Sequence, residues 1–513
     1  MKSNLTITLI GGSNMDFFKK RKEKKQQLQN IEPKKESLKP KSKDVTEAKY
    51  INSRTGMQFS LTFVSTVVDE EIIQKDILPD LLEGDFATIG DIKKLLPVAD
   101  VEITTDMAKV DQKIYNGYIL LQVETDEGKY AFIAAQKEIT RSVSAPEIEF
   151  SVIGPKEAFI ESLDQNLNLI RKRLPVKQLI VEELTVGKLS KTRIAILYME
   201  DIVEMENVET VKQRLESLEF DEISDSSFVE QLISDNQASP FPIFLDTERP
   251  DRAAGSLSQG KVVMVVDGSP HALIGPTTLL EFFVSFEDYY LNWIIATFSR
   301  ILRIFSVVFS IIVTPLYVAA LTYHYQMVPR AVMATLISSR QGVPLPPILE
   351  ALVLEITIEL LREAGARLPT KIGQTIGIVG GIVIGTASVE AGLTSNVLLI
   401  FVALAALASF TTPIYKIGNT IRFIRFPFLI FAQLWGLLGI VFCFCILLTH
   451  LIRLTSLGRP YLEPIYPPRW SDLKDTIVRL GFSKQAKRPK YLRTDKKKRF
   501  SSKNAKQKID IDE

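Results

Sequence analysis

Four long segments without any Asp, Glu, Lys or Arg lie between Arg303 and Arg453 of this chain. The segments are residues 304–329, 372–389, 391–415 and 426–452. A helix needs about 20 apolar residues to cross the hydrocarbon layer of a membrane, so each segment is long enough to span it. The residues before Arg303 mix charged and apolar positions as a water-soluble protein does. We therefore expect an integral membrane protein with a large soluble head.

The soluble part alternates between strand-like and helix-like patterns. Strand-like strings include FSLTFVS, GYILLQVE, AFIAAQ and the valine-rich residues 261–267. Strands that alternate with helices favour parallel pairing in a layered α/β fold. The expected fold class is an α+β and α-helical membrane protein, in which a head of two α/β subdomains precedes a polytopic transmembrane helical domain.

Changes in composition indicate where these domains begin and end. Residues 1–56 are rich in Lys, Glu, Gln, Ser and Pro, and are expected to be a disordered basic leader. The other expected domains are residues 57–145 and 146–290 (the two subdomains), 291–453 (transmembrane) and 454–513 (a Pro/Tyr segment and a basic tail). The string Gly11 to Met15 resembles a translated purine-rich ribosome-binding site, so we expect synthesis to begin at Met15.

Basic residues near the apolar segments favour the cytoplasmic side of a membrane. Arg300 and Arg303 precede the first segment, whereas Lys416, Arg422 and Arg425 lie in an expected loop between two others. Four spans would place that loop outside, and a fifth span at 347–361 would place the tail outside instead. A re-entrant segment would reconcile the two. We expect the head to be cytoplasmic, and the basic tail to lie near anionic lipid rather than nucleic acid.

The two cysteines, Cys443 and Cys445, lie within the last apolar segment. This number and placement exclude a disulfide framework, and without neighbouring thiols or imidazoles they do not indicate a metal site. No cofactor is expected.

The segment 372–390 has two distinct sides. Glycines at every fourth position lie within about 120° of one another on a helix, which permits close helix packing. They are Gly373, Gly377, Gly381 and Gly385. The opposite side carries the candidate pore-lining residues Thr375, Val379, Ile382, Thr386 and Glu390. A ring of such helices would form a water path with a dry constriction. An ordinary buried helix in a bundle remains the alternative.

The preceding segment, 347–367, is apolar but carries a stripe of charges. A carboxylate in lipid is costly, so the stripe must face water, the headgroup zone or a partner charge. Glu359 and Arg362 have the spacing of an in-helix pair. Glu355, Glu359 and Arg362 are candidates for gating or for a cation pathway. A helix lying flat at the membrane interface is the alternative.

Charged residues cluster at 247–252, in the string TERPDR. Glu248 and Asp251, with His271, could in principle act as an acid/base pair, but no nucleophile, glycine-rich phosphate loop or metal-ligand spacing accompanies them. We therefore do not expect an enzyme. Glu248, Arg249, Asp251 and Arg252 are expected to pair with each other or with a neighbouring subunit, and to couple the head to the membrane domain.

Four separated blocks of sequence resemble the A subunits of GerA-type spore germinant receptors. They begin RSVSAPEIEFSVIGPKEAF at Arg141, SPFPIFLDTERPDRAAGS at Ser239, VPRAVMATLISSRQGVPLPP at Val328 and SLGRPYLEPIYPP at Ser456. The blocks occur in the expected order, and the resemblance as a whole extends over most of residues 57–468, which is far more specific than any short motif.

This resemblance implies a subunit of a complex in the inner membrane of bacterial endospores. Its expected partners are a transporter-like B subunit, a lipoprotein C subunit, further copies of itself and membrane lipid. The resemblance also implies an oligomeric, ligand-gated cation channel that helps to trigger germination. Alternatives are an accessory paralogue or membrane scaffold that senses no nutrient, and a secondary transporter, although the inverted repeat of a transporter is not visible.

Overall fold

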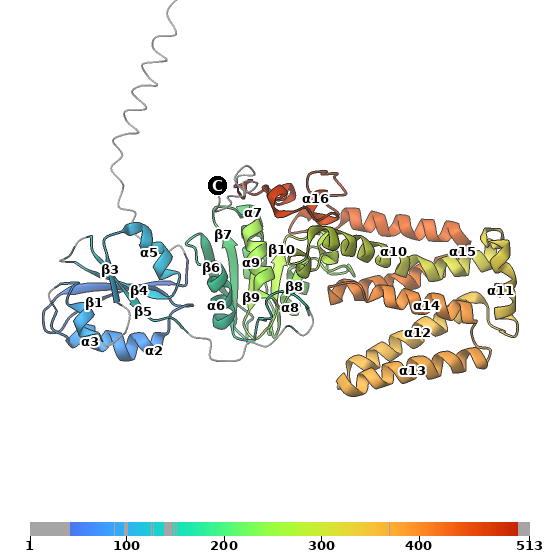
Figure 1. Ribbon diagram of the computed structural model, residues 1–513, viewed down its shortest axis with the longest axis horizontal. Helices are drawn as coiled ribbons and strands as arrows, with labels where there is room; N and C mark the ends of the chain where they lie inside the picture. Colours follow the sequence, from blue (N-terminus) through green and yellow to red (C-terminus); the bar gives the residue numbers. More distant parts are fainter. Residues whose placement is uncertain are drawn as a thin grey trace, which may run out of the picture. The chain divides into compact units, whose positions relative to one another are not determined.

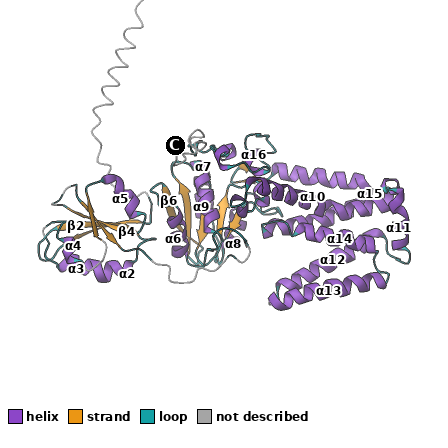
Figure 2. Cartoon of the chain, in the orientation of Figure 1, coloured by secondary structure: helices purple, strands orange, loops and turns teal. Residues whose placement is uncertain are grey.

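The computed structural model describes residues 42–86, 88–96, 101–124, 126, 128–137, 146, 149, 151–368 and 370–500. Within these residues, Figures 1 and 2 show two β-sheets with their helices and a bundle of long helices. Much of the expected leader lies outside the described residues. Its last part does not, because Val45–Ile51 forms strand β1 and pairs along its whole length with β2 (Gln58–Val64). The prediction of disorder up to residue 56 is therefore wrong for this strand.

The first sheet has the strand order β1-β2-β4-β5-β3. Its other strands are β4 (Tyr118–Val123), β5 (Tyr130–Ala134) and β3 (Val101–Thr104). Helical segments accompany it: α2 (Glu70–Ile72), the π-helical η1 (Ile73–Ile77), α3 (Leu78–Glu83), α4 (Ile92–Leu95) and α5 (Met107–Ile114). Apolar side chains such as Leu61, Ile119 and Phe132 are fully buried between these elements and form a core of their own.

The second sheet has the order β6-β7-β9-β10-β8. The strands are β6 (Leu179–Val186), β7 (Thr192–Met199), β9 (Val262–Val266), β10 (Ala272–Gly275) and β8 (Leu245–Thr247). The helices are α6 (Leu163–Arg173), α7 (Met205–Glu216), α8 (Ser226–Ile233) and α9 (Pro250–Gln259). Every residue of β9 is buried, which explains its nearly uninterrupted run of valines.

The expected parallel pairing is wrong, because every strand pair recorded in the two sheets is antiparallel. Strands β6 and β7 are joined by residues 187–191 alone, which is too short for the crossover that parallel neighbours need. Between β7 and β9 the chain does pass through helices, but β9 still runs antiparallel to β7. Alternation of helices and strands indicates layers without fixing strand direction.

Within the residues that the structure describes, the helical domain contains six α-helices of more than ten residues. They are α10 (Trp293–Tyr323), α11 (Arg330–Arg340), α12 (Pro347–Ala366), α13 (Thr370–Glu390), α14 (Asn396–Ser409) and α15 (Tyr415–Arg453). In the described part of the chain, α10 and α15 are the two helices that are long and apolar enough to cross a membrane. Helix α14 has 14 residues. At 1.5 Å per residue it is only about 21 Å long, so segment 391–415 does not form the full-length span expected of it.

Helix α15 folds back on itself at Gly436, whose backbone angles are φ 60° and ψ −134°. The rings of Phe431 and Phe442 lie 5.8 Å apart, whereas 11 residues of straight helix would separate them by about 16 Å. The tip of α10 holds this turn, because the Tyr323 hydroxyl donates to the carbonyl of Gln433 at 2.8 Å. We name residues 415–435 the first arm and 437–453 the second arm.

This fold-back corrects two expectations. Segment 426–452 is not one straight span, and residues 416–425 are not a loop but the beginning of the first arm. Both arms reach the head. Lys416 of the first arm lies 3.0 Å from Asp246 of β8, and His450 of the second arm lies 2.9 Å from the Ser239 hydroxyl. The apolar side of the arms joins the core of the second sheet.

The chain returns to the head after α15. Residues 455–460 form the small hairpin β11 (Thr455–Ser456) and β12 (Arg459–Pro460), and the buried Tyr461 then donates its hydroxyl to the carbonyl of Pro242 at 2.9 Å. The helical domain thus begins and ends at the second sheet. The sequence left the side of the tail undecided, and these contacts place its described residues beside the head.

Candidate functional site

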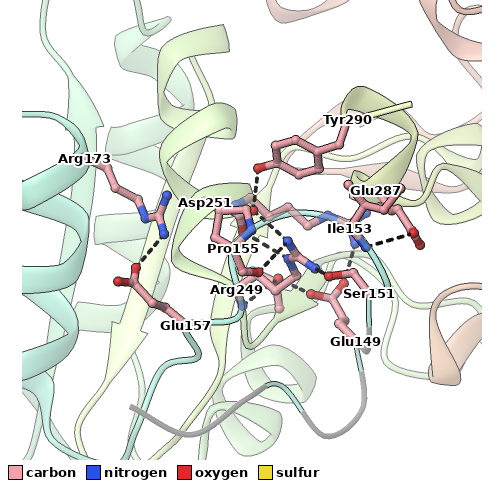
Figure 3. Close-up of polar contacts among 12 residues, drawn as sticks. Glu149, Ser151, Ile153, Pro155, Glu157, Arg173, Arg249, Asp251, Glu287 and Tyr290 are labelled. Atoms are coloured by element: carbon pink, nitrogen blue, oxygen red, sulfur yellow. Dashed lines mark hydrogen bonds and ion pairs between the residues drawn. The ribbon is translucent and has the colours of Figure 1, made fainter. Parts of the chain in front are cut away.

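Three groups of charged residues connect the head to the helical domain. The first surrounds Arg249, just before α9, and is drawn in Figure 3. The buried Arg249 guanidinium forms two bonds to the Asp251 carboxylate, of 3.0 and 2.7 Å, and one to the carbonyl of Pro155. Asp251 also accepts the hydroxyl of Tyr290 at 2.7 Å, and Tyr290 lies three residues before α10. This cluster therefore reaches the start of α10.

The electrostatics of Asp251 fit a permanently charged carboxylate. Burial opposes its ionisation, but the bonds from Arg249 and Tyr290 outweigh that effect and lower the pKa of Asp251. The charge is therefore kept over the physiological range.

The other predicted coupling residues stay within the head. Arg252 is ion-paired with Glu149, and Glu248 lies 3.3 Å from the His271 imidazole. The hydrogen bond to Glu248 raises the pKa of His271. Of the four predicted residues, Arg249 and Asp251 pair with each other, as expected. Of these four residues, Asp251 accepts the hydrogen bond from Tyr290, which lies just before α10. A coupling role for the set stays a prediction.

The second group is centred on Lys416. The sequence alone indicated this residue only as a basic loop residue that favours the cytoplasmic side of a membrane. Its ammonium is ion-paired with Glu230 of α8 and with Asp246 of β8. Burial raises the pKa of Glu230, and Lys416 opposes that shift. Thr420, one turn further along, donates to the carbonyl of Pro240. The first arm is therefore bound to two elements of the head.

Two pockets flank Lys416. One has a volume of about 400 Å³ and is lined by α8, by residues 234–243 and by the first arm. The other, of about 200 Å³, is lined by Asp225, Asp246, Glu248, His271 and Lys416, among others. Among the described residues, no group of three or more His, Cys, Asp or Glu side chains is placed to hold a metal ion.

The third group joins the first arm to α12. Arg425 is ion-paired with Glu355, and both side chains are buried. Arg425 also donates to the Ser310 hydroxyl of α10 at 2.7 Å, and the Thr314 hydroxyl donates to Glu355 at 3.1 Å. Partner charges therefore satisfy this carboxylate, which is one of the three possibilities that the sequence left open.

One turn closer to the head, the Glu359 carboxylate is ion-paired with two arginines. The expected in-helix pair with Arg362 is present, and Arg422 of the first arm lies 3.7 Å from the same carboxylate. Arg362 also donates to Asn419 at 3.1 Å. The structure thus brings Glu355, Glu359 and Arg362 together at the interface of α12 with the first arm. Their assignment to a cation pathway stays a prediction.

Helix α13 carries the predicted pore-lining and glycine positions. The side chains of Thr375 and Val379, and the positions Gly373 and Gly377, lie outside the residues whose surroundings are described. In the single chain Ile382 is 63 % exposed, and Thr386 and Glu390 are exposed as well.

The glycine side of α13 is only partly in contact with the rest of the chain. A Cβ at Gly385 would lie 3.7 Å from Leu399, whereas one at Gly381 would meet open space. The closest approach is at Gly380, outside the predicted stripe, where a Cβ would come within 2.8 Å of Leu361 on α12. Figure 1 shows α12 and α13 side by side, and this contact fixes one side of α13.

Comparison with known proteins gives a consistent result. The family model described as "Bacillus/Clostridium GerA spore germination protein" matches residues 34–491. The chain is 50 % identical to spore germination protein GerQA of Bacillus cereus over 461 residues, which cover 90 % of this chain and 92 % of that protein. It is 38 % identical to spore germination protein A1 of Bacillus subtilis over 432 residues, covering 84 % of this chain and 89 % of that protein.

Among solved structures, the N-terminal domain of the A subunit of the Bacillus megaterium spore germinant receptor GerK3 is similar. It shares 25 % identity and matches 46 % of this chain and 89 % of its own, with a TM-score of 0.36. The family match spans the head, the helical domain and most of the described tail, and its relatives match over nearly their whole lengths. The chain therefore belongs to the Bacillus/Clostridium GerA family of spore germination proteins.

Proposed function

We propose that this protein is the A subunit of a nutrient germinant receptor in the spore inner membrane, and that several copies form a ligand-gated cation channel. The observation that carries the channel proposal is the exposure of α13. One side of this helix packs on α12, and the other leaves Ile382, Thr386 and Glu390 uncovered in the single chain. Around a symmetry axis, a ring of such helices would enclose a path with polar ends and an apolar constriction.

The first arm of α15 is the proposed link between signal and channel. Its cations bind successively to the head and to α12: Lys416 to Glu230 and Asp246, Arg422 to Glu359, and Arg425 to Glu355. Helix α12 in turn carries α13. A partner that favours one of two positions of the head would thereby shift the pore helices through one rigid element.

The proposed membrane arrangement is multi-pass, with the head and tail together on the cytoplasmic side. Arg300 and Arg303 support this arrangement, because they lie beside the head, ion-paired with Asp288, and basic residues next to a span favour the cytoplasmic side. The proposed partners are a transporter-like B subunit, which would hold the nutrient, and a lipoprotein C subunit.

Conductance of the purified protein in planar bilayers tests the proposal. Changing Val379 and Ile382 together to Ala should widen the constriction and produce a constitutive cation leak. The matched control is Phe305→Ala on α10, which removes an apolar side chain that is 63 % exposed on a helix outside the proposed pore. Silent bilayers for both variants, with single copies in particle images, would favour the scaffold role instead.

A further inference from the structure

The start of α10 and a turn of the C-terminal tail form one surface. Helix α10 begins at Trp293, and the 3-10 turn η5 (Phe482–Lys484) lies against it. A Cβ placed on Gly481 would lie 4.0 Å from the Trp293 ring, and the Thr297 hydroxyl donates to the carbonyl of Arg479 at 3.2 Å. Two segments almost 190 residues apart are thus held together at the point where the first long apolar helix begins.

Arg479 fixes this arrangement. Its side chain is almost fully buried, and its guanidinium donates to the carbonyls of Asp288, Tyr289 and Leu291, at 2.5, 2.9 and 2.5 Å. The same guanidinium lies 4.9 Å from the centre of the Phe482 ring. Three carbonyl bonds and a stacked ring leave little freedom to the turn, so Phe482 is presented in a defined position.

The apolar side chains at the start of α10 and on the η5 turn are exposed. Trp293 is 46 % exposed, Phe482 62 % and Phe298, further along α10, 67 %. These exposed rings differ from scattered apolar residues on a water-soluble protein, because they lie at the start of α10, which is a long apolar helix. Tryptophan and other aromatic rings at the end of such a helix are typical of the level of the lipid headgroups.

Exposed lysines follow directly in the sequence. Lys484 ends the η5 turn, and Lys487 and Lys490 come next. The chain carrying them is not free, because the backbone amide of Lys490 donates to Asp472 at 2.8 Å and the neighbouring Tyr491 is buried and bonded to Glu281. These contacts hold the described part of the tail that carries the lysines in a defined position.

We propose that this junction surface, formed by Trp293, Phe298, Phe482, Lys484, Lys487 and Lys490, binds the headgroups of anionic phospholipids. The rings insert at the level of the glycerol backbone, and the lysines neutralise lipid phosphates above them. The occupant follows from charge complementarity and from continuity with the apolar helix. Binding holds the tail and the start of α10 at one depth, so the head is attached to the lipid surface as well as to the helices. The proposal rests on the membrane placement given above but not on ion conduction.

The test uses the full-length protein with Trp435 and Trp470 changed to Phe, so that Trp293 is its single tryptophan. It is reconstituted in phosphatidylcholine vesicles that contain brominated phosphatidylglycerol or, in parallel, brominated phosphatidylcholine. Brominated phosphatidylglycerol should quench Trp293 about threefold more efficiently, and high salt should remove the difference. Changing Lys484, Lys487 and Lys490 to Gln should abolish the preference while leaving quenching by brominated phosphatidylcholine unchanged.

The matched control changes three exposed lysines of the head, Lys75, Lys177 and Lys188, to Gln, and should retain the preference. Equal quenching by the two lipids in the protein with native lysines, or a preference that survives the Lys484, Lys487 and Lys490 changes, overturns the proposal. A second protein that retains only Trp435, on the first arm near its turn, distinguishes failure of the junction surface from failure of the membrane placement. If lipid quenches Trp435 but not Trp293, the junction surface is refuted alone. If lipid quenches neither, the membrane placement fails as well.

Discussion

Arg425 of the first arm of α15 forms a buried ion pair with Glu355 of α12, and the two residues are separated by 70 positions in the chain. Two full charges away from water are tolerated only when each satisfies the other, and here Ser310 and Thr314 supply further hydrogen bonds. The pair fixes the position of α12 relative to the element that contacts the head. Its integrity is therefore a condition for any signal to pass along that route.

Removing one partner of this pair should be strongly destabilising. Arg425→Met leaves the Glu355 carboxylate buried without its counter-charge, and we expect a loss of about 3–5 kcal/mol. The measurement is the thermal unfolding midpoint of the full-length protein in detergent. The double variant Arg425→Met with Glu355→Gln should recover most of the loss. The exposed pair Lys188 and Glu219 is the control, and Lys188→Met should cost under about 1 kcal/mol. Equal costs at the two sites would contradict the prediction.

Lys416 should hold the head on the first arm. Lys416→Met leaves the buried Glu230 and the partly buried Asp246 without their cation, so the pKa of Glu230 rises further and the contact loosens. We expect about tenfold faster hydrogen exchange in α8, which corresponds to a loss of roughly 1–2 kcal/mol locally. Lys75→Met, which breaks an exposed i,i+4 pair with Glu71, should leave α8 unchanged. Unaltered exchange in α8 of the Lys416 variant would exclude this coupling.

Acid should weaken the N-terminus of α8 through Asp225. This side chain caps the helix by accepting the backbone amide of Ser227 at 3.0 Å and also accepts the Ser269 hydroxyl. Burial opposes its ionisation, but these hydrogen bonds outweigh it and lower the pKa of Asp225 to about 2. A carboxyl whose pKa is lower in the folded state contributes stability above its unfolded value of about 3.9, and loses it as the pH falls toward 2.

The expected contribution of this charge is about 1 kcal/mol, because solvent screening reduces the full linkage value. Unfolding of the full-length protein is followed from about pH 5 to about pH 2, and Asp225→Asn is compared with the native protein. Asn retains a cap acceptor but cannot titrate, so the variant should be less sensitive to acid over this range. An identical pH profile for the two proteins would show that Asp225 is not responsible.

Gly436 should be required for the fold-back of α15. Its φ of 60° lies in the region that L side chains rarely adopt, and a Cβ there would come within 2.8 Å of the His324 imidazole. Gly436→Ala should cost about 1–3 kcal/mol, measured as a lower unfolding midpoint. Gly458 also has a positive φ, of 73°, but a Cβ there would meet no atom within 4 Å. Gly458→Ala should therefore lower the unfolding midpoint less. A larger loss of stability for Gly458→Ala than for Gly436→Ala would contradict the requirement for glycine at the fold-back.

Some features of this protein are readable from its sequence alone. The uncharged segments located the helical domain, because the absence of charge reports the surroundings of a residue wherever its partners lie. The valine run at 261–267 indicated a buried strand, and the three-residue spacing of Glu359 and Arg362 indicated a pair on one helix. Each of these properties depends on residues close together in the chain.

Tertiary structure decided the rest, for a common physical reason. The direction of the strands, the turn at Gly436 and the partners of Lys416 and Arg425 depend on which distant segments meet, and no local periodicity encodes that choice. Lys416 resembled an orienting loop charge in the sequence, yet its partner Glu230 lies 186 positions earlier. A buried charge is satisfied by whichever opposite charge folding brings to it, so the partners of Lys416 and Arg425 became visible only in the folded structure.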